Sequence, residues 1–202
     1  MSETRQIDEQ RLEEDVAYRY EYLAEFMGFD SDDVSAIHAT APKLFPLLPA
    51  VVEATYDKLL HFSATRRHFV PRQHGYEGEL PESDEALNHD AGQIRFRKEH
   101  LRRYLMTVIG NPYDARMTKY LDVVGKIHTP KAGNKQIDVP LVQMNALMGV
   151  MSDMLLKAVS NLELDAEQKT RTLLAYNKLL WIQNDLINRH YAEPQPVLAK
   201  NQ

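Results

Sequence analysis

The stretch that decides the fold of this chain runs from Asn111 to Met148 and reads NPYDARMTKYLDVVGKIHTPKAGNKQIDVPLVQMNALM. Its first part predicts a helix with Asn111 as N-cap and Pro112 as the first helical residue; it ends before Pro130, because the residue preceding a proline avoids the α-helical region. Four positions follow at steps of four, three and four and share one face: Met117, Leu121, Val124 and His128. His128 therefore faces inward from the last turn.

A histidine in this position has one ring nitrogen that can donate to a carbonyl one turn back, while the other nitrogen can bind a metal. The alternative is a core histidine that bonds only to the backbone, as most buried polar groups do. Neither HExxH nor a repeated Glu-x-x-His pair occurs in the chain, so a site made only of protein ligands is not indicated. One inward histidine suits a haem, whose four nitrogens supply the rest of the iron coordination.

The composition is typical of one globular domain: of 202 residues, 44% are hydrophobic and 26% are charged. The formal net charge of −5 argues against a nucleic-acid partner. Because the chain has no cysteine, disulfides and the CxxCH motif for covalent haem attachment are excluded. The first fifteen residues are acidic and polar, and no apolar run approaches the length of a membrane span. We therefore expect no membrane contact and a cytoplasmic location.

Helical periodicity extends along most of the chain and convincing strand signals are missing, which predicts an all-α protein of about seven or eight helices. We expect one domain over residues 1–192, a loop over 71–88 and a loose tail over 193–202. The expected helices cover roughly 9–27, 31–38, a segment beginning near 49, 90–109, 112–128, 141–158 and 166–190. Gly28 is expected just past the end of one helix, and Gly110 is expected to end another in the left-handed conformation. Tyr56 shares an inward stripe with Val52 and Leu59, and its hydroxyl could meet a ligand in a central pocket; a core tyrosine bonded to the backbone is the alternative.

Several segments, in order, carry a family resemblance: RYEYLAEFMGFDSDDVSAI, ATYDKLLHF, RKEHLRRYL, NPYDARM with VVGKIH, and VPLVQMNALMGVMSDML. Together they resemble the globin domain of globin-coupled sensors and the related protoglobins. The resemblance implies a globin fold with an additional N-terminal helix and a non-covalent haem b. It also implies that His128 is the proximal iron ligand and that Tyr56 is the distal residue that donates a hydrogen bond to bound ligand.

Around this pair we expect a pocket lined by Leu59, Leu101, Leu105, Val124, Leu147 and Met148. The position that faces the iron on the distal helix is assigned to Leu101, and a shift of one turn would exchange it with Arg97 or Leu105. Arg97 is expected to reach either a haem propionate or the distal pocket, although an exposed ion pair would also suit it. His74 and His89, in and beside the 71–88 loop, are expected to be exposed rather than distal ligands.

The resemblance favours a protein that reversibly binds a diatomic gas (O₂, CO or NO), most readily a gas or redox sensor with no catalytic residue. An enzyme that detoxifies nitric oxide or reactive nitrogen and oxygen species is one alternative. A haem-free helical interaction protein is another, although Tyr56 and His128 together argue against it. We further expect a homodimer through the last two long helices, and a separate signalling partner because no transmitter domain follows Tyr191.

Overall fold

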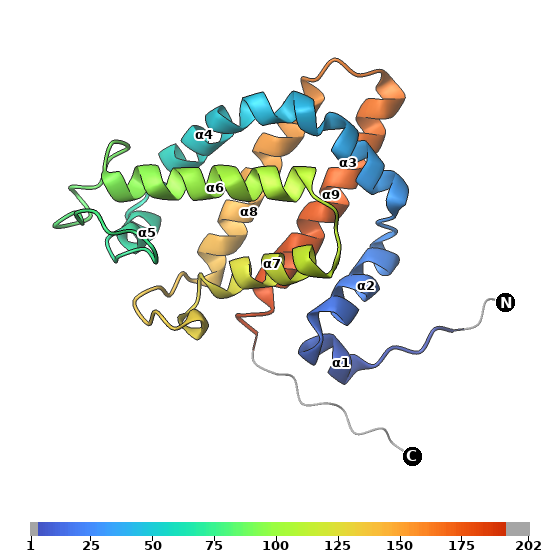
Figure 1. Cartoon of the computed structure of the whole chain (residues 1–202), viewed down its shortest axis with the longest axis horizontal. Helices are drawn as coiled ribbons and strands as arrows, with labels where there is room; N and C mark the ends of the chain where they lie inside the picture. Colours follow the sequence, from blue (N-terminus) through green and yellow to red (C-terminus); the bar gives the residue numbers. More distant parts are fainter. Residues whose placement is uncertain (1–3, 193–202) are drawn as a thin grey trace.

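The computed structural model describes residues 4–192, and every regular element in that range is a helix, as Figure 1 shows. The α-helices are α1 (Glu9–Glu14), α2 (Val16–Met27), α3 (Ser31–Leu44), α4 (Leu48–His61), α5 (Ser63–Arg66), α6 (Gly92–Gly110), α7 (Ala115–Lys126), α8 (Leu141–Ser160) and α9 (Ala166–Asn188). Short 3₁₀ turns cover Phe45–Leu47, Arg67–Phe69 and Pro130–Ala132. The all-α prediction is confirmed. The expected tail over 193–202 lies outside the described residues.

The N-terminal region differs from the single helix expected over 9–27. The helix is interrupted at Asp15, which ends α1 in an extended conformation and then caps α2 by accepting from the backbone N–H groups of Ala17 and Tyr18. The backbone N–H groups in the first turn of a helix have no partner within the helix, and the Asp15 carboxylate supplies one. A new helix therefore begins after Asp15. Gly28 ends α2 with a φ of 64°, as expected.

Helix α3 continues six residues beyond the predicted end at His38 and contains Pro42. It begins with a capping box in which Asp30 and Asp33 satisfy each other's backbone N–H groups. Ile37, Ala41 and Leu44 are buried along its inner face. The free energy gained by burying these three side chains exceeds the loss of the one backbone hydrogen bond that Pro42 removes.

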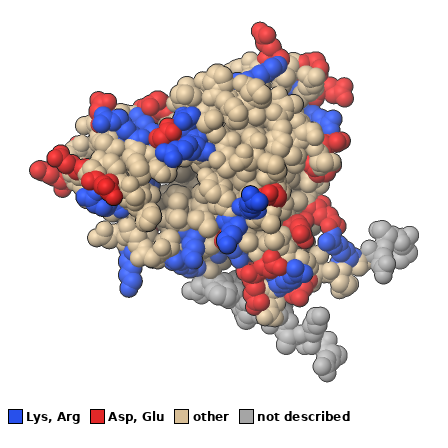
Figure 2. Space-filling view, viewed as in Figure 1, with Lys and Arg blue, Asp and Glu red and all other residues tan. Residues whose placement is uncertain are grey.

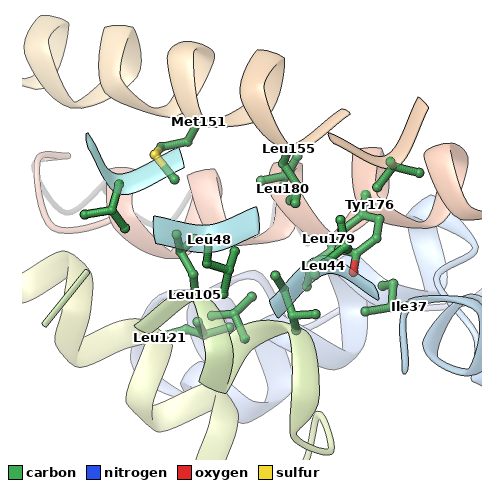
Figure 3. Packing of buried hydrophobic residues seen from close by; sticks show 14 of the residues in the cluster. Ile37, Leu44, Leu48, Leu105, Leu121, Met151, Leu155, Tyr176, Leu179 and Leu180 are labelled. Carbon is green, nitrogen blue, oxygen red and sulfur yellow. The ribbon is translucent and has the colours of Figure 1, made fainter. Parts of the chain in front are cut away.

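The core lies between α9 and the helices around it. Helix α9 packs against α3, α7 and α8, while α4 packs against α6 and α8. Figure 3 shows the resulting contact zone, to which five helices contribute Ile37, Leu44, Leu48, Leu105, Leu155, Tyr176 and Leu179. None of the helices between residues 4 and 192 combines the length and the apolar character needed to cross a bilayer.

The junction between α6 and α7 departs from prediction in two ways. Gly110 does not adopt the left-handed conformation but remains the last residue of α6, where an added Cβ would lie 3.0 Å from the Phe45 ring. Helix α7 begins three residues later than expected, because Asp114 accepts from the N–H groups of Arg116 and Met117. Asn111, expected to cap α7, instead caps the end of α6.

Although they follow each other in sequence, α6 and α7 are held by different neighbours. Helix α6 packs on α3 and α4, whereas α7 packs on α2 and α9. Helix α7 ends at Lys126, so His128 stands in the turn just beyond it rather than in its last turn. Figure 2 shows basic and acidic side chains interspersed on the visible face of the molecule, without a continuous surface of one charge.

Candidate functional site

His128 has the hydrogen bond that the sequence predicted. Its Nδ1 lies 2.7 Å from the carbonyl oxygen of Val124, so the ring donates there and its orientation is fixed. The half-buried side chain loses solvation, which lowers the pKa of His128 to about 4; the bond to Val124 acts in the opposite direction. The imidazole is therefore neutral near pH 7. Within residues 4–192 the ring makes its hydrogen bond through Nδ1, which leaves the lone pair of Nε2 available to a metal.

Tyr56 lies on α4 and is almost completely buried, with 4% of its surface exposed. Its ring centroid is 5.6 Å from that of Phe69 in the 3₁₀ turn after α5. Burial raises the pKa of the Tyr56 hydroxyl, and the nearby positive charge of Arg97 partly opposes that rise. The hydroxyl therefore keeps its proton and can act as a donor.

Arg97 on α6 lies close enough to Tyr56, the predicted distal residue, and to His128, the predicted proximal residue, to influence the pKa of both. Its guanidinium lies over the Phe69 ring, 4.7 Å from the centroid, and beside the Tyr56 hydroxyl. The same charge contributes to the lowered pKa of His128. The structure thus brings Tyr56, Arg97 and His128 to one region from three separate elements.

Two residues that the sequence analysis missed, Gln93 and Gln73, hold this region together. The Gln93 side chain, with no exposed surface, donates from Nε2 to the carbonyls of Phe69 (2.6 Å) and Pro71 (2.9 Å). Its Oε1 accepts from the Gln73 backbone N–H at 3.0 Å. Gln73 in turn accepts a hydrogen bond from Arg97. The spacing of Gln93, four residues before Arg97, could have placed it on the same face of α6.

Two buried polar atoms near Arg97 have no hydrogen-bond partner among residues 4–192. They are Nε2 of His68, beside Phe69, and Oε1 of Gln143, in the first turn of α8. Desolvation is the main cause of the lowered pKa of His68, and Gln143, Asp138 and Arg97 all lie close enough to affect it. The influence of Gln143 on the pKa of His68 is that of a hydrogen bond, so the two side chains lie close enough to serve each other as polar partners.

The remaining predicted pocket residues lie inside or against the core. Leu105 is buried, and Leu59, Leu101, Leu147 and Met148 are partly buried against the core. Met148 also lines a cleft between α8 and α9. His74 is exposed, whereas His89 is half-buried and bonded to Glu53 and Asp57 on α4.

Haem is the cofactor that the resemblance to protoglobins implies. Within residues 4–192 no three His, Asp or Glu side chains converge as metal ligands, but one neutral imidazole is oriented with a free nitrogen. Tyr56 and Arg97 supply donors beside apolar groups, and Nε2 of His68, when it carries a proton, could donate to a carboxylate of a porphyrin. The residues present therefore fit a haem.

The helical fold is that of a globin. The chain aligns with the globin domain of a Geobacter sulfurreducens globin-coupled sensor with a TM-score of 0.67 and 18% identity, covering 86% of this chain and 97% of that one. No curated protein matches the sequence. The family model for Protoglobin matches residues 16–196, and the chain belongs to the protoglobin family.

Proposed function

We propose that this globin binds haem b non-covalently, with His128 as the proximal ligand and Tyr56 on the distal side. The observation that carries the proposal is the state of His128, whose imidazole is neutral, oriented by Val124 and unpaired at Nε2. When bound, the haem iron supplies an open coordination position for a diatomic gas. With no cysteine in the chain, covalent attachment is not available.

The protein side chains have separate tasks in this proposal. Val124 holds the His128 ring through its carbonyl, which makes the imidazole a better donor to a metal. Leu101 and Leu105 keep water away from the distal side. The Tyr56 hydroxyl donates to partial negative charge on the ligand, and such a charge-assisted bond is stronger than a neutral one. O₂ would gain more than CO, because bound CO carries little charge.

We further propose that the protein senses a gas or the redox state rather than catalysing a reaction, and that it does so in the cytoplasm as a homodimer. The support for a dimer is the cleft of about 460 Å³ between α8 and α9, whose lining has no charged residue: Asn145, Met148, Gly149, Ser152, Asn177, Leu180, Trp181, Asn184 and Asn188. Trp181 is 59% exposed there, and Leu174, on the same helix, is 56% exposed. Interfaces favour large aromatic side chains at sites that lack charge.

The absorption spectrum of the purified protein, as isolated, after reduction and after addition of CO, tests haem binding. We expect a Soret band. Acid-acetone should extract the haem, because it is not covalently attached. His128→Ala should lose most of its haem affinity, because the iron then lacks its only protein ligand. His74→Ala, on the exposed loop, is the matched control and should bind haem normally. Failure of the wild-type protein to bind added haem, or an unchanged five-coordinate ferrous spectrum in His128→Ala, would contradict the proposal.

A further inference from the structure

Arg97 is a half-buried cation without a carboxylate partner among the residues that the structure describes. Two other arginines with little exposed side-chain surface do have a carboxylate partner: Arg19 pairs with Asp185 at 2.6 Å, and Arg189 pairs with Asp122 at 2.6 Å. Arg66 has no carboxylate but donates to three backbone carbonyls instead. Burying a charge without compensation is costly, so the site around Arg97 favours an anion.

Arg97 has more donors than its neighbours use. A guanidinium carries five N–H donors; within residues 4–192 one of those of Arg97 meets Oε1 of Gln73, and the group also lies against the Tyr56 hydroxyl. The stacked Phe69 ring covers one face of the group but accepts no conventional hydrogen bond. Several N–H groups are therefore left to address a ligand in the plane of the guanidinium.

The side chain is also held in place rather than free to leave. Gln93 on α6 fixes the backbone at Phe69, Pro71 and Gln73, and Gln73 then holds Nη1 of Arg97. A donor held before the ligand arrives loses little entropy on binding, which increases its contribution to affinity.

The guanidinium lies beside the Tyr56 hydroxyl. Because a guanidinium has only donors, it can address only the oxygen lone pairs of Tyr56 and leaves the hydroxyl proton for a ligand. The Arg97 guanidinium and the Tyr56 hydroxyl thus lie side by side, and each can donate to a ligand. Such a set of donors recognises negative charge.

We propose that Arg97, positioned by Gln73, makes the distal pocket selective for small anionic ligands of the ferric haem, of which azide is the probe. This inference rests on the proposed function, because it assumes that haem occupies the pocket. It goes beyond gas binding by assigning the ferric protein a preferred class of ligand. The other anion within chemical reach is a haem propionate, and the experiment below separates the two.

The test compares wild type with Arg97→Met, which keeps an unbranched stem and removes the guanidinium and its charge. Spectrophotometric titration measures the affinity of the ferric protein for azide and of the ferrous protein for CO, and transfer to an acceptor protein measures the rate of haem loss. We expect azide affinity to fall about ten- to hundredfold, the usual worth of hydrogen bonds to a charged group. CO affinity and haem loss should change by less than about threefold, because neither involves the lost charge.

Arg95→Met is the matched control, since Arg95 lies two residues away on α6, is exposed and donates to the carbonyl of Asp90. It should leave azide affinity unchanged. Gln73→Leu keeps Arg97 but removes the hydrogen bond that holds its guanidinium, so it should weaken azide binding several-fold. If circular dichroism shows that Arg97→Met folds poorly, Gln73→Leu provides the test instead.

Faster haem loss in Arg97→Met with unchanged azide affinity would assign Arg97 to a propionate and overturn the inference. Equal azide affinity in wild type, Arg97→Met and Gln73→Leu would overturn it as well. Absence of a Soret band in the wild-type protein would instead refute the proposed function, so the two failures are distinguishable.

Discussion

At the scale of single residues, Tyr56 is the side chain that we propose to discriminate between gaseous ligands. It is buried, its hydroxyl keeps its proton, and it stands beside Arg97. We expect Tyr56→Phe to weaken O₂ affinity by about 1.5–3 kcal/mol, the worth of a hydrogen bond to a charged acceptor. The O₂ dissociation rate should then rise by roughly one to two orders of magnitude. CO should be nearly unaffected.

Stopped-flow measurement of O₂ and CO dissociation from both proteins checks this prediction. Tyr113→Phe is a suitable control, because that hydroxyl donates to the carbonyl of Val108 at 2.5 Å and serves the structure. It should lower the unfolding free energy by about 1 kcal/mol without changing the O₂ rate. An unchanged O₂ rate in Tyr56→Phe would mean that Tyr56 points away from the ligand and that Arg97 is the main polar group.

At the scale of elements, the contact of α7 with α9 sets the position of His128. At Gly125, three residues before His128, an added Cβ would lie 2.8 Å from Cα of Ile187 and 2.9 Å from the carbonyl oxygen of Leu186. Real Cβ atoms do not approach backbone atoms so closely, so the two helices would have to separate. We expect Gly125→Ala to destabilise the protein by about 1–3 kcal/mol, the usual cost of overpacking.

Because α7 leads directly to His128, the same variant should also lose haem faster than wild type. Gly149→Ala is the control within one subunit, since nothing lies within 4 Å of a Cβ at that helical position; because Gly149 lines the proposed dimer cleft, both variants are compared at a concentration where the protein is monomeric. It should be neutral or stabilising by up to about 1 kcal/mol, because alanine has the higher helix propensity. Urea denaturation at one fixed protein concentration gives both values. Equal unfolding free energies for the two variants would contradict the prediction, because they would show that the α7–α9 contact accommodates the added Cβ without loss of stability.

A second contact between these helices is electrostatic. Asp122 on α7 pairs with Arg189 at 2.6 Å and with His190 at 2.9 Å, all with less than 20% of their side chains exposed. Asp122→Asn would leave Arg189 without its carboxylate in a poorly solvated place. We expect a loss of about 1–3 kcal/mol in unfolding free energy, less than for a fully buried pair because some solvent reaches the site. Asp153→Asn, whose pair with Lys157 is exposed, should change stability by less than about 0.5 kcal/mol.

At the scale of the whole molecule, the exposed face of α8 and α9 is the surface that we propose for a homodimer. The prediction is a dimer at micromolar concentration in analytical ultracentrifugation, which Trp181→Glu converts to a monomer by placing a charge in an apolar contact. Phe62→Glu is the matched control, because Phe62 is 56% exposed at the end of α4, compared with 59% for Trp181. A monomeric wild-type protein, or dissociation by both variants alike, would contradict it.

The local features of this chain were predictable because they depend on residues a few positions apart. Helical periodicity gave the all-α class, Gly28 ended α2, and the bond from His128 to the Val124 carbonyl followed from a four-residue separation. Helix ends were less predictable. Asp15, Asp114 and Pro42 each allow two outcomes in isolation, and the choice depends on caps and burial that neighbouring helices provide.

The sequence by itself thus determined the helical class, the family and an inward imidazole with one nitrogen free. Only the tertiary structure decided where Arg97 points. Its neighbours Gln73 and Phe69 belong to a segment more than twenty residues away, and Gln93 fixes that segment through hydrogen bonds to its backbone. Periodicity assigns a residue to a face of its own helix, but it cannot say which loop will cover that face, because loop position depends on contacts between distant parts of the chain.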